Sequence, residues 1–307
     1  MKIAVPDLVS NSYFPAIAAV ELGKFAEQGI DASIELIFPV NKAYAALRAG
    51  EVDCVAGSAH AALSAFPEWN GAKLVCAQAQ GMYWFLVMRS DLAGERGDVG
   101  VVKGRRIGAA PWVELGLRQL LVACGIDAEC DGVSIAPVPN TGGAAVNFGL
   151  TAAKALHDRL IDGFWANGMA SEIAVRSGAG KVVLDVRRGD GPKECFNYTM
   201  ASLAVTDRLL AERPHDAARM VQAIDAAHAA LKKDVALAAT IGRKVFPSGE
   251  ARLIAGLIER DLPYYSSAIT PDFVTGMNAF ARNVGILKGN PGYADVVALS
   301  SRGGSPS

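Results

Sequence analysis

Two stretches of the chain repeat one pattern, and this repetition constrains the fold more than any other feature. Residues 45–63 read AALRAGEVDCVAGSAHAAL, and residues 152–171 read AAKALHDRLIDGFWANGMAS. When Asp53 is aligned with Asp162, each stretch runs from Ala-Leu through a polar turn into an apolar residue, the Asp, a short apolar run and a small polar residue, Ser58 or Asn167. The pattern is typical of a helix followed by a strand. Its repetition predicts two halves of similar build.

The flanking sequence continues this alternation of helices and strands over most of the chain. Strand-like segments at 2–6, 30–38, 52–57 and 72–80 alternate with helical segments at 13–29, 41–50 and 58–69. After a connector at 91–104, strands are predicted at 105–110, 132–138, 161–167 and 181–186, and helices at 113–125, 142–159 and 169–178. Repeated strand–helix–strand units predict mostly parallel sheets flanked by helices. We therefore expect two βαβαβ units, at roughly 1–85 and 104–186.

The rest of the chain is predicted to be helical, at 207–234, 235–246, 248–262 and 270–287. Apolar residues at Met220, Ala223, Ile224, Ala227 and Leu231 follow the stripe of a helix that packs on another element. A chain of 307 residues exceeds what one hydrophobic core usually holds, so two lobes are expected.

Composition restricts the partners. The formal net charge is −1 and only 20% of residues are charged, so neither a nucleic acid nor an anionic membrane surface is an expected partner. No apolar run approaches the ~20 residues of a membrane helix, so direct membrane insertion is not expected. The first residues, MKIAVPDL, are predicted to form a strand rather than an export signal. The chain is therefore expected to be periplasmic if a leader was removed, and cytoplasmic if the sequence is complete.

Loops beyond the carboxyl ends of parallel strands are where open α/β sheets bind ligands, close to helix N-termini. Residues that commonly cap helices lie on these predicted loops: Ser10, Asn11, Ser12, Ser58, Thr141 and Asn167. Each of them can simply cap its own helix. If both halves face one cleft, however, the two sets of caps would together supply donors for a ligand.

Aromatic residues form only 7% of the chain, yet several fall at the same strand ends: Tyr13, Tyr83, Trp84, Trp112, Trp165 and Tyr198. Core packing can explain any one of them. Trp112 and Trp165 are flanked by polar or small residues, so a cleft wall is the better interpretation for these two. His60, in the first turn of the helix predicted after the third strand, is a further candidate for the cleft.

Signals for catalysis, metal or cofactor binding are weak. No two histidines have the spacing of metal ligands, and the chain has no Gly-rich phosphate loop followed by Lys and Ser or Thr. Asp53 and Asp162 are predicted at strand starts, at the end opposite the cleft, so they do not form an acid–base pair. Cys54 has no recognisable activating partner, and Cys124 and Cys130 flank a turn where they could pair. No cofactor is expected.

Several longer segments of the chain show a family resemblance. The runs LGKFAEQGIDASIELIF, VKGRRIGAA, LIDGFWANGMASEIAVRSGAGKVVLD and YYSSAITPDFVTGMNAFARNVGIL resemble the solute-binding proteins of ABC importers for sulfonates, nitrate, taurine and thiamine-pyrimidine precursors. The resemblance covers almost the whole chain. It implies the type II periplasmic-binding-protein fold, with lobe one at 1–88 plus 200–307, lobe two at 89–199, and the ligand in the cleft between them.

The resemblance also implies which residues bind the ligand and which partner receives it. The matching loops hold Ser10 to Tyr13, Ser58 and His60, Tyr83, Trp112, Thr141 with Gly142, and Trp165 with Asn167; Tyr198 joins them from the second hinge strand. The partner implied is an ABC importer permease, and the expected state is a monomer. No Arg stands in these loops to clamp a sulfonate or carboxylate. With uncharged donors and aromatic walls, the expected ligand is small, flat, and neutral or weakly anionic.

Two other functions remain open. The same superfamily includes cytoplasmic enzymes, and this chain could act on an aromatic or heteroaromatic acid through His60 or a cysteine. It lacks, however, the Cys-rich motif of the pyrimidine synthase and the first-loop Cys of the desulfinase. A cytoplasmic ligand sensor is the third possibility.

Overall fold

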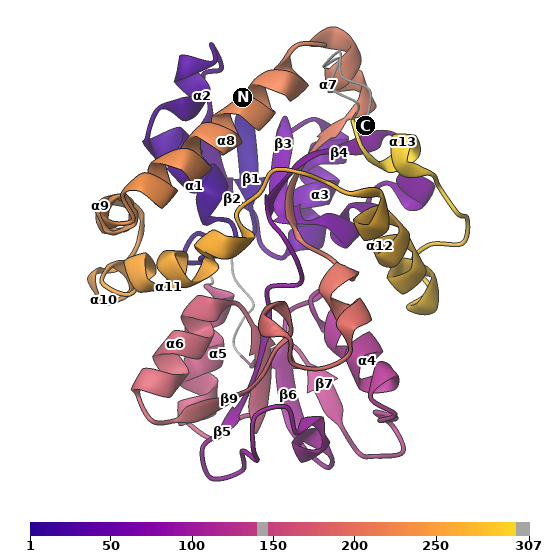
Figure 1. The fold of residues 1–307 in the computed structure, drawn as a ribbon. Coiled ribbons are helices and arrows are strands. Elements are labelled where there is room, and N and C mark those ends of the chain that lie inside the picture. The colour runs from indigo at the N-terminus through magenta and orange to yellow at the C-terminus, as the bar shows by residue number, and fades with distance from the viewer. Residues whose placement is uncertain (140–146, 299–307) are drawn as a thin grey trace.

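The computed structural model describes residues 1–139 and 147–298. They form two five-stranded sheets, one in the upper and one in the lower half of the molecule as drawn in Figure 1. The upper sheet has the order β2-β1-β3-β10-β4. Its strands are β1 (Lys2–Val5), β2 (Ser33–Leu36), β3 (Cys54–Ser58), β4 (Ala72–Ala79) and β10 (Ala201–Thr206). β1 is parallel to β2 and β3, whereas β10 is antiparallel to β3 and β4. We call this sheet and the helices that cover it lobe one.

The lower sheet repeats the arrangement and defines lobe two. Its order is β7-β6-β8-β5-β9, from β5 (Phe85–Arg89), β6 (Arg106–Ala109), β7 (Ser134–Ala136), β8 (Gly163–Ala166) and β9 (Gly180–Asp185). Here β5 is the antiparallel strand, placed between β8 and β9. The mostly parallel sheets flanked by helices that the sequence predicts are confirmed.

The two repeated phrases perform the same structural task in each lobe. The first ends helix α3 (Val40–Ala49) and starts β3, and the second ends α5 (Phe148–His157) and starts β8. Asp53 accepts a hydrogen bond from the backbone N–H of Lys2 at 2.8 Å, and Asp162 accepts one from the N–H of Arg106 at 2.9 Å. Each Asp therefore fastens its strand to the start of the neighbouring parallel strand, far from the carboxyl ends of the sheet.

Helices from both ends of the chain cover lobe one (Figure 1). On one face, α8 (Asp216–Lys233) packs against α1 (Phe14–Glu21), α2 (Lys24–Glu27) and β4. Its apolar stripe, including Met220 and Ile224, shares a core with Ile3 and Leu203. On the other face, α3 and α12 (Pro271–Asn283) share a core with β3 and β10. The C-terminal helices are thus part of lobe one rather than a separate domain.

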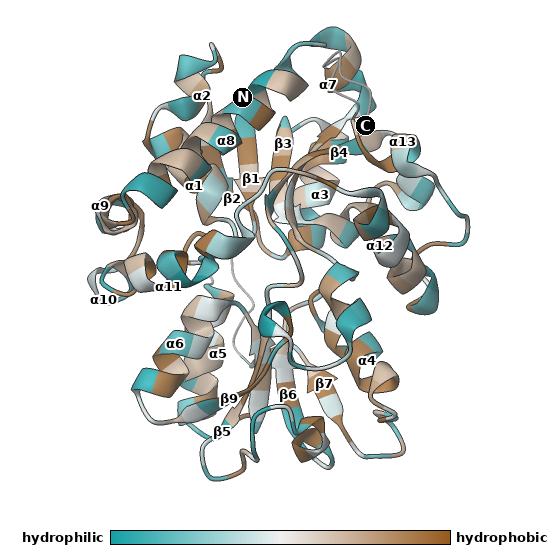
Figure 2. Cartoon of the chain, viewed as in Figure 1, coloured by the Kyte–Doolittle hydropathy of each residue, from teal (hydrophilic) through white to brown (hydrophobic). Residues whose placement is uncertain are grey.

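The remaining helices complete the two lobes. They are α4 (Glu114–Ala123) and α6 (Gly168–Arg176) in lobe two, and α7 (Asp207–Glu212), α9 (Ala236–Val245), α10 (Ser248–Ala251), α11 (Ile254–Asp261) and α13 (Tyr293–Val296) in lobe one. Figure 2 shows apolar residues concentrated in the strands of both sheets, with hydrophilic residues on the outer helices. Among the described residues, no helix is long and apolar enough to cross a membrane.

Several predicted helices are broken or tighter than expected. The helix predicted at 13–29 is divided at Gly23, whose φ of +69° interrupts it. The segment predicted as a helix at 58–69 forms 3-10 turns, Ala59–Ser64 and Pro67–Trp69, and the backbone there has positive φ at Glu68 and Trp69. Residues with φ above zero cannot continue a right-handed helix. Glu68 and Trp69 therefore prevent one continuous helix over 58–69.

The chain passes between the lobes twice, at 80–84 and at 186–200. The lobe boundaries predicted from the sequence, 1–88 plus 200–307 and 89–199, stay a prediction. The structure places residues 85–88 in the sheet of lobe two, because β5 pairs there with β8 and β9 along its whole length. All five cysteines are free, so Cys124 and Cys130 are not paired.

Candidate functional site

A small cavity lies where the two lobes meet, beyond the carboxyl ends of β1, β6 and β8. Lobe one and the first crossing contribute Pro6, Asp7, Ser12, Tyr13, Phe38, Val40, Tyr83 and Trp84; lobe two contributes Ala110, Pro111, Val113, Phe148, Ala166 and Asn167. The volume of the cavity that the centre of a water molecule can occupy is about 40 Å³. Since one water needs roughly 10–15 Å³ on this measure, the closed cavity holds only a few waters. An organic ligand would need the lobes to move apart.

Among the described residues of the cavity wall, Asp7 is the one acidic residue, and it lies two positions beyond the end of β1. Its Oδ1 accepts hydrogen bonds from the N–H of Val9 at 3.0 Å and from Asn147 Nδ2 at 2.7 Å, while its Oδ2 accepts one from Asn167 Nδ2 at 2.9 Å. Burial raises the pKa of Asp7 to about 7, although these three hydrogen bonds oppose the shift. Asn147 and Asn167 belong to lobe two, so the Asp7 carboxylate also joins the lobes.

Two tyrosine hydroxyls and an unpartnered serine supply the other polar groups of the cavity. The Tyr13 and Tyr83 hydroxyl oxygens lie 3.0 Å apart, with the rings edge to face. One hydroxyl must donate to the other, which leaves one hydrogen for a further acceptor. Ser12 is buried, and its Oγ has no hydrogen-bond partner. The cavity therefore offers donors as well as the carboxylate.

Aromatic rings form much of the remaining wall. Phe38 of lobe one and Phe148 of lobe two are stacked, with ring centroids 6.2 Å apart and planes inclined by 22°. Trp84 contacts the ring of Tyr83 at a centroid distance of 5.0 Å. Since the stacked pair comes from different lobes, opening the lobes would separate two parallel faces between which a flat ligand fits.

Solved structures with the same architecture cover nearly the whole chain. A protein of Bordetella bronchiseptica RB50 is 23% identical, over 96% of this chain and 91% of its own, with a TM-score of 0.74. The periplasmic aliphatic sulphonate binding protein SsuA from Escherichia coli is 11% identical, over 100% and 94%, with a TM-score of 0.71. The Candida albicans CA3427 gene product, described as exhibiting the generic periplasmic binding protein structural fold, is 16% identical, over 95% and 92%, with a TM-score of 0.63.

This chain has the periplasmic-binding-protein fold. The fold class predicted from the sequence is thereby confirmed, with each sheet carrying one antiparallel strand. No protein-family model matches the chain, and no curated protein matches it either.

Within this periplasmic-binding-protein fold, four of the predicted site residues line the cavity. They are Ser12, Tyr13, Tyr83 and Asn167. Asn167 also caps α6, because its Oδ1 accepts from the N–H groups of Met169 and Ala170. Asn167 is therefore both a helix cap and a residue of the cavity wall. Thr141 and Gly142 lie outside the described residues.

Other predicted residues lie near the cavity but not on its wall. Ser10 accepts from the N–H of Ser12, and Asn11 joins Asp261 in lobe one to the N–H of Met169 in lobe two. The backbone oxygen of Ser58 accepts from the Tyr44 hydroxyl. All three residues are buried.

His60 and the remaining aromatic residues are held in the protein interior or at the lobe boundary. His60 contacts Thr199 and the carbonyl of Trp112, and burial lowers its pKa to about 4. Trp165 is fully buried, edge to face with Trp84 at 6.2 Å, so it packs behind the cavity rather than forming its wall. Tyr198 is stacked on Phe280 at 4.7 Å.

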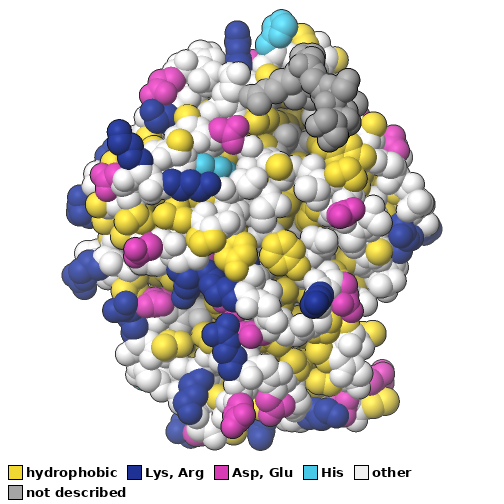
Figure 3. All heavy atoms as spheres, in the orientation of Figure 1, with side chains coloured by type: hydrophobic (Ala, Val, Ile, Leu, Met, Phe, Trp, Pro, Cys, Tyr) yellow, Lys and Arg dark blue, Asp and Glu magenta, His cyan; other side chains and the backbone are white. Residues whose placement is uncertain are grey.

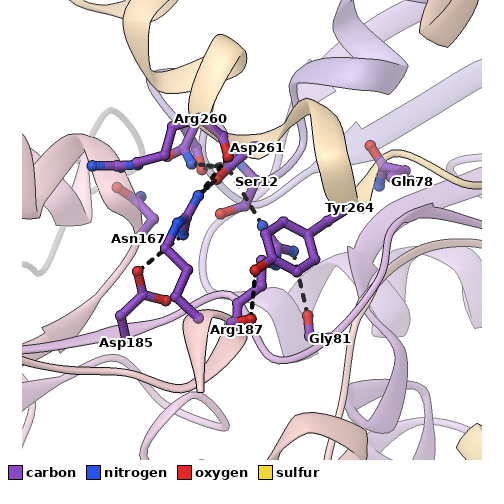
Figure 4. Close-up of polar contacts among 12 residues, drawn as sticks. Ser12, Gln78, Gly81, Asn167, Asp185, Arg187, Arg260, Asp261 and Tyr264 are labelled. Atoms are coloured by element: carbon purple, nitrogen blue, oxygen red, sulfur yellow. Dashed lines mark hydrogen bonds and ion pairs between the residues drawn. The ribbon is translucent and has the colours of Figure 1, made fainter. Parts of the chain in front are cut away.

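A cluster of charged residues, Asp185, Arg187, Arg188 and Asp261, fastens the lobes beside the cavity (Figure 4). Arg188, at the start of the second crossing, binds Asp261 of lobe one at 2.9 Å and Asp185 of lobe two at 2.9 Å. Arg187 lies 3.4 Å from Asp261 and donates to the carbonyl of Gly81 at 3.3 Å. Only 3% of the Arg187 side chain is exposed. We call these four residues the interlobe charge cluster.

The interlobe charge cluster reaches the cavity through Tyr83. The Arg187 guanidinium lies over the Tyr83 ring at 5.8 Å and over the Tyr264 ring at 5.1 Å. On the face shown in Figure 3, acidic and basic side chains are interspersed over both lobes, and basic ones are denser at the waist between them.

Sequence reasoning missed the interlobe charge cluster and Asp7. The signal for Asp7 was available, since it is a charged residue two positions beyond the first strand.

Proposed function

We propose that this protein captures a small organic solute between its two lobes and delivers it to the permease of an ABC importer. The observation that carries the proposal is the cavity at the carboxyl ends of β1, β6 and β8, because its wall is shared between lobes that are joined by two chain crossings. Binding by closure of two lobes is a hinge motion, in which a few crossing residues absorb the change.

Proteins of this fold support the same assignment. The Escherichia coli protein of this fold is a periplasmic sulphonate binding protein, and a Staphylococcus aureus structure of this fold is a ligand binding component of an ABC-type import system. We further propose that the present chain acts as a monomer in the periplasm, where it would meet both solute and permease.

The enzyme alternative finds less support in the residues it would use. Both ring nitrogens of His60 are within hydrogen-bond distance of partners, at 3.0 and 2.9 Å. Burial raises the pKa of Cys54, Cys76 and Cys195, which keeps these thiols protonated and poorly nucleophilic. Among the described residues of the cavity wall, only Asp7 has a pKa suited to proton transfer near neutrality.

Recovery of the bound solute separates capture from catalysis. The protein would be isolated from cells that make it, denatured, and the released compound identified by mass spectrometry. On incubation with fresh protein, a captured solute keeps its mass, and the radius of gyration measured by X-ray scattering differs between the free and the bound protein. Conversion of the compound to another mass would instead establish an enzyme. Loss of solute uptake on deletion of the gene would support delivery to an importer.

A further inference from the structure

Asp7 differs from every other buried acidic residue in the described part of the chain. Four acidic side chains are buried there: Asp7, Asp162, Asp185 and Asp261. The last three are paired with arginines, at 3.1 Å for Asp162 and Arg106 and at 2.9 Å for both Asp185 and Asp261 with Arg188. Asp7 has only neutral amides and one backbone N–H as partners. A buried carboxylate without a cation is costly, so its position in a cavity points to a ligand that compensates it.

The hydrogen bonds of Asp7 leave one acceptor position open. A carboxylate oxygen accepts about two hydrogen bonds. Oδ1 already accepts from Val9 and Asn147, whereas Oδ2 accepts only from Asn167. The free position on Oδ2 suits one further N–H donor. A charged donor would form the stronger bond, because hydrogen bonds between ionised groups are shorter and stronger than neutral ones.

The rest of the cavity wall fits a flat ring with acceptors as well as donors. Phe38 and Phe148 present parallel faces from opposite lobes. The buried Ser12 Oγ has no partner, and one hydrogen of the Tyr13–Tyr83 pair remains to be donated. An aromatic nitrogen base combines these features, since it has apolar faces, N–H donors and ring-nitrogen acceptors on one edge.

An anionic ligand fits this wall poorly. The Arg187 guanidinium is 5.8 Å from the Tyr83 ring and is already bound to Asp261 and Gly81. A sulfonate or carboxylate in the cavity would therefore lie beside Asp7 without a positive partner among the described wall residues. Like charges in a low-dielectric site repel strongly. This argues against the weakly anionic ligand that the cap residues led us to expect.

We propose that the solute is a small aromatic nitrogen base that donates an N–H to Oδ2 of Asp7 while its ring lies between Phe38 and Phe148. The assignment rests on the proposed solute-binding function. It names the class of solute and identifies Asp7 as the residue that selects it. The rival interpretation is that Asp7 only fastens the lobes through Asn147 and Asn167.

Four aromatic probes of similar size test the assignment by calorimetry: benzamidine, benzamide, benzoate and benzenesulfonate. At pH 8 we expect benzamidine to bind about tenfold or more tightly than either anion, because it places a charged N–H donor beside the carboxylate. Asp7→Asn should reduce benzamidine binding by about tenfold or more and change benzamide binding much less. The exposed Asp31→Asn, which changes the net charge equally, should change neither.

The wild-type protein gives a second readout that does not depend on how the variant folds. Benzamidine affinity should fall about tenfold for each pH unit below the pKa of Asp7, near 7, whereas benzamide affinity should stay level. The other titratable groups facing the cavity do not change charge there, since burial raises the pKa of Tyr13 and Tyr83, and His60 behind Trp84 has a pKa of about 4.

Three results would overturn the assignment. Tighter binding of benzoate or benzenesulfonate would reverse the charge preference, although the protein would remain a solute-binding protein. Equal loss of all four probes in Asp7→Asn would mean that Asp7 acts on lobe closure alone. No binding of any probe at millimolar concentration would reject the aromatic nitrogen base. The delivery proposal fails separately, if the natural solute is chemically converted or if its uptake does not need this protein.

Discussion

The imidazole of His60 in lobe one donates from Nε2 to the backbone carbonyl of Trp112 in lobe two, at 2.9 Å. A carbonyl can only accept, so Nε2 carries the proton, and Nδ1 accepts from the hydroxyl of Thr199 at 3.0 Å. Trp112 itself has a φ of +71°, a strained value for a residue with a side chain. A neutral histidine thus holds a strained backbone turn against the opposite lobe.

This arrangement predicts loss of stability in acid. Because the pKa of His60 is about 4 in the folded protein and near 6.5 when unfolded, its contribution is present above pH 6.5 and is lost as pH falls toward 4. Between pH 7 and pH 5 the contribution of His60 to the unfolding free energy is expected to fall by about 2 kcal/mol. His60→Gln, which keeps a donor near the Nε2 position, should reduce that loss in urea titrations. Exposed His157→Gln is the control, and an equal loss in all three proteins would contradict the argument.

Asp7 predicts the opposite pH dependence. Its pKa is raised to about 7 in the folded protein, so Asp7 favours folding most below pH 4. The stabilising contribution of Asp7 is lost as pH rises to 7. The unfolding free energy of Asp7→Asn minus that of the wild type should therefore grow between pH 4 and pH 8, by up to about 4 kcal/mol.

Asp162→Asn provides the matched contrast for Asp7. The hydrogen bonds from Arg106 lower the pKa of Asp162, so its contribution is present at neutral pH and disappears in acid. Asp162→Asn should therefore be most harmful above pH 4, where Asp7→Asn becomes increasingly favourable. Parallel slopes for the two variants in denaturant titrations would refute the assignment of Asp7 as an unpaired carboxylate.

The interlobe charge cluster predicts a large cost for losing one buried partner. Asp261→Asn leaves the nearly buried Arg187 without its carboxylate, and breaking a buried pair commonly costs about 3–5 kcal/mol. Arg188→Ala should cost less, because 21% of the Arg188 side chain is exposed. X-ray scattering should also show a larger radius of gyration for Asp261→Asn. A variant as stable and as compact as the wild type would show that the cluster does not hold the lobes together.

Cavity wall and core should respond differently to loss of an aromatic ring. Phe148→Ala removes a stacked wall residue and should weaken benzamidine binding by roughly 1 kcal/mol or more, with a smaller effect in Phe148→Leu. Trp165→Ala removes a fully buried ring and should instead lower the unfolding free energy by about 3–5 kcal/mol. Strong loss of affinity in a stably folded Trp165→Ala would restore the sequence-based view of Trp165 as a cleft wall.

The fold could be predicted because the apolar periodicity of the helices and strands and the internal repeat both indicate it. The phrase around Asp53 and Asp162 recurs because each lobe must fasten one strand to the next at the same point. The rule that ligands lie beyond strand ends also found Ser12, Tyr13, Tyr83 and Asn167.

The rest depended on three-dimensional information that the sequence does not show. Arg187 and Asp261 are far apart along the chain, and only lobe closure makes them a pair. Trp165 alternates with Phe164 and Ala166 along β8, so the backbone decides that its ring faces the core behind the cavity. The small and polar residues that follow it, Ala166 and Asn167, could not reveal that direction.

The position of β10 has a consequence for how the protein is made. This strand lies between β3 and β4, yet it is the last strand to be synthesised. A ribosome that has reached residue 200 has supplied all five strands of lobe two, whereas the sheet of lobe one is still split, with the facing edges of β3 and β4 unpaired. The lobe that comes second in the sequence is thus the first that translation can finish. The N-terminal strands must wait, with open edges, for residues 201–206 and for the helix α8 that covers them.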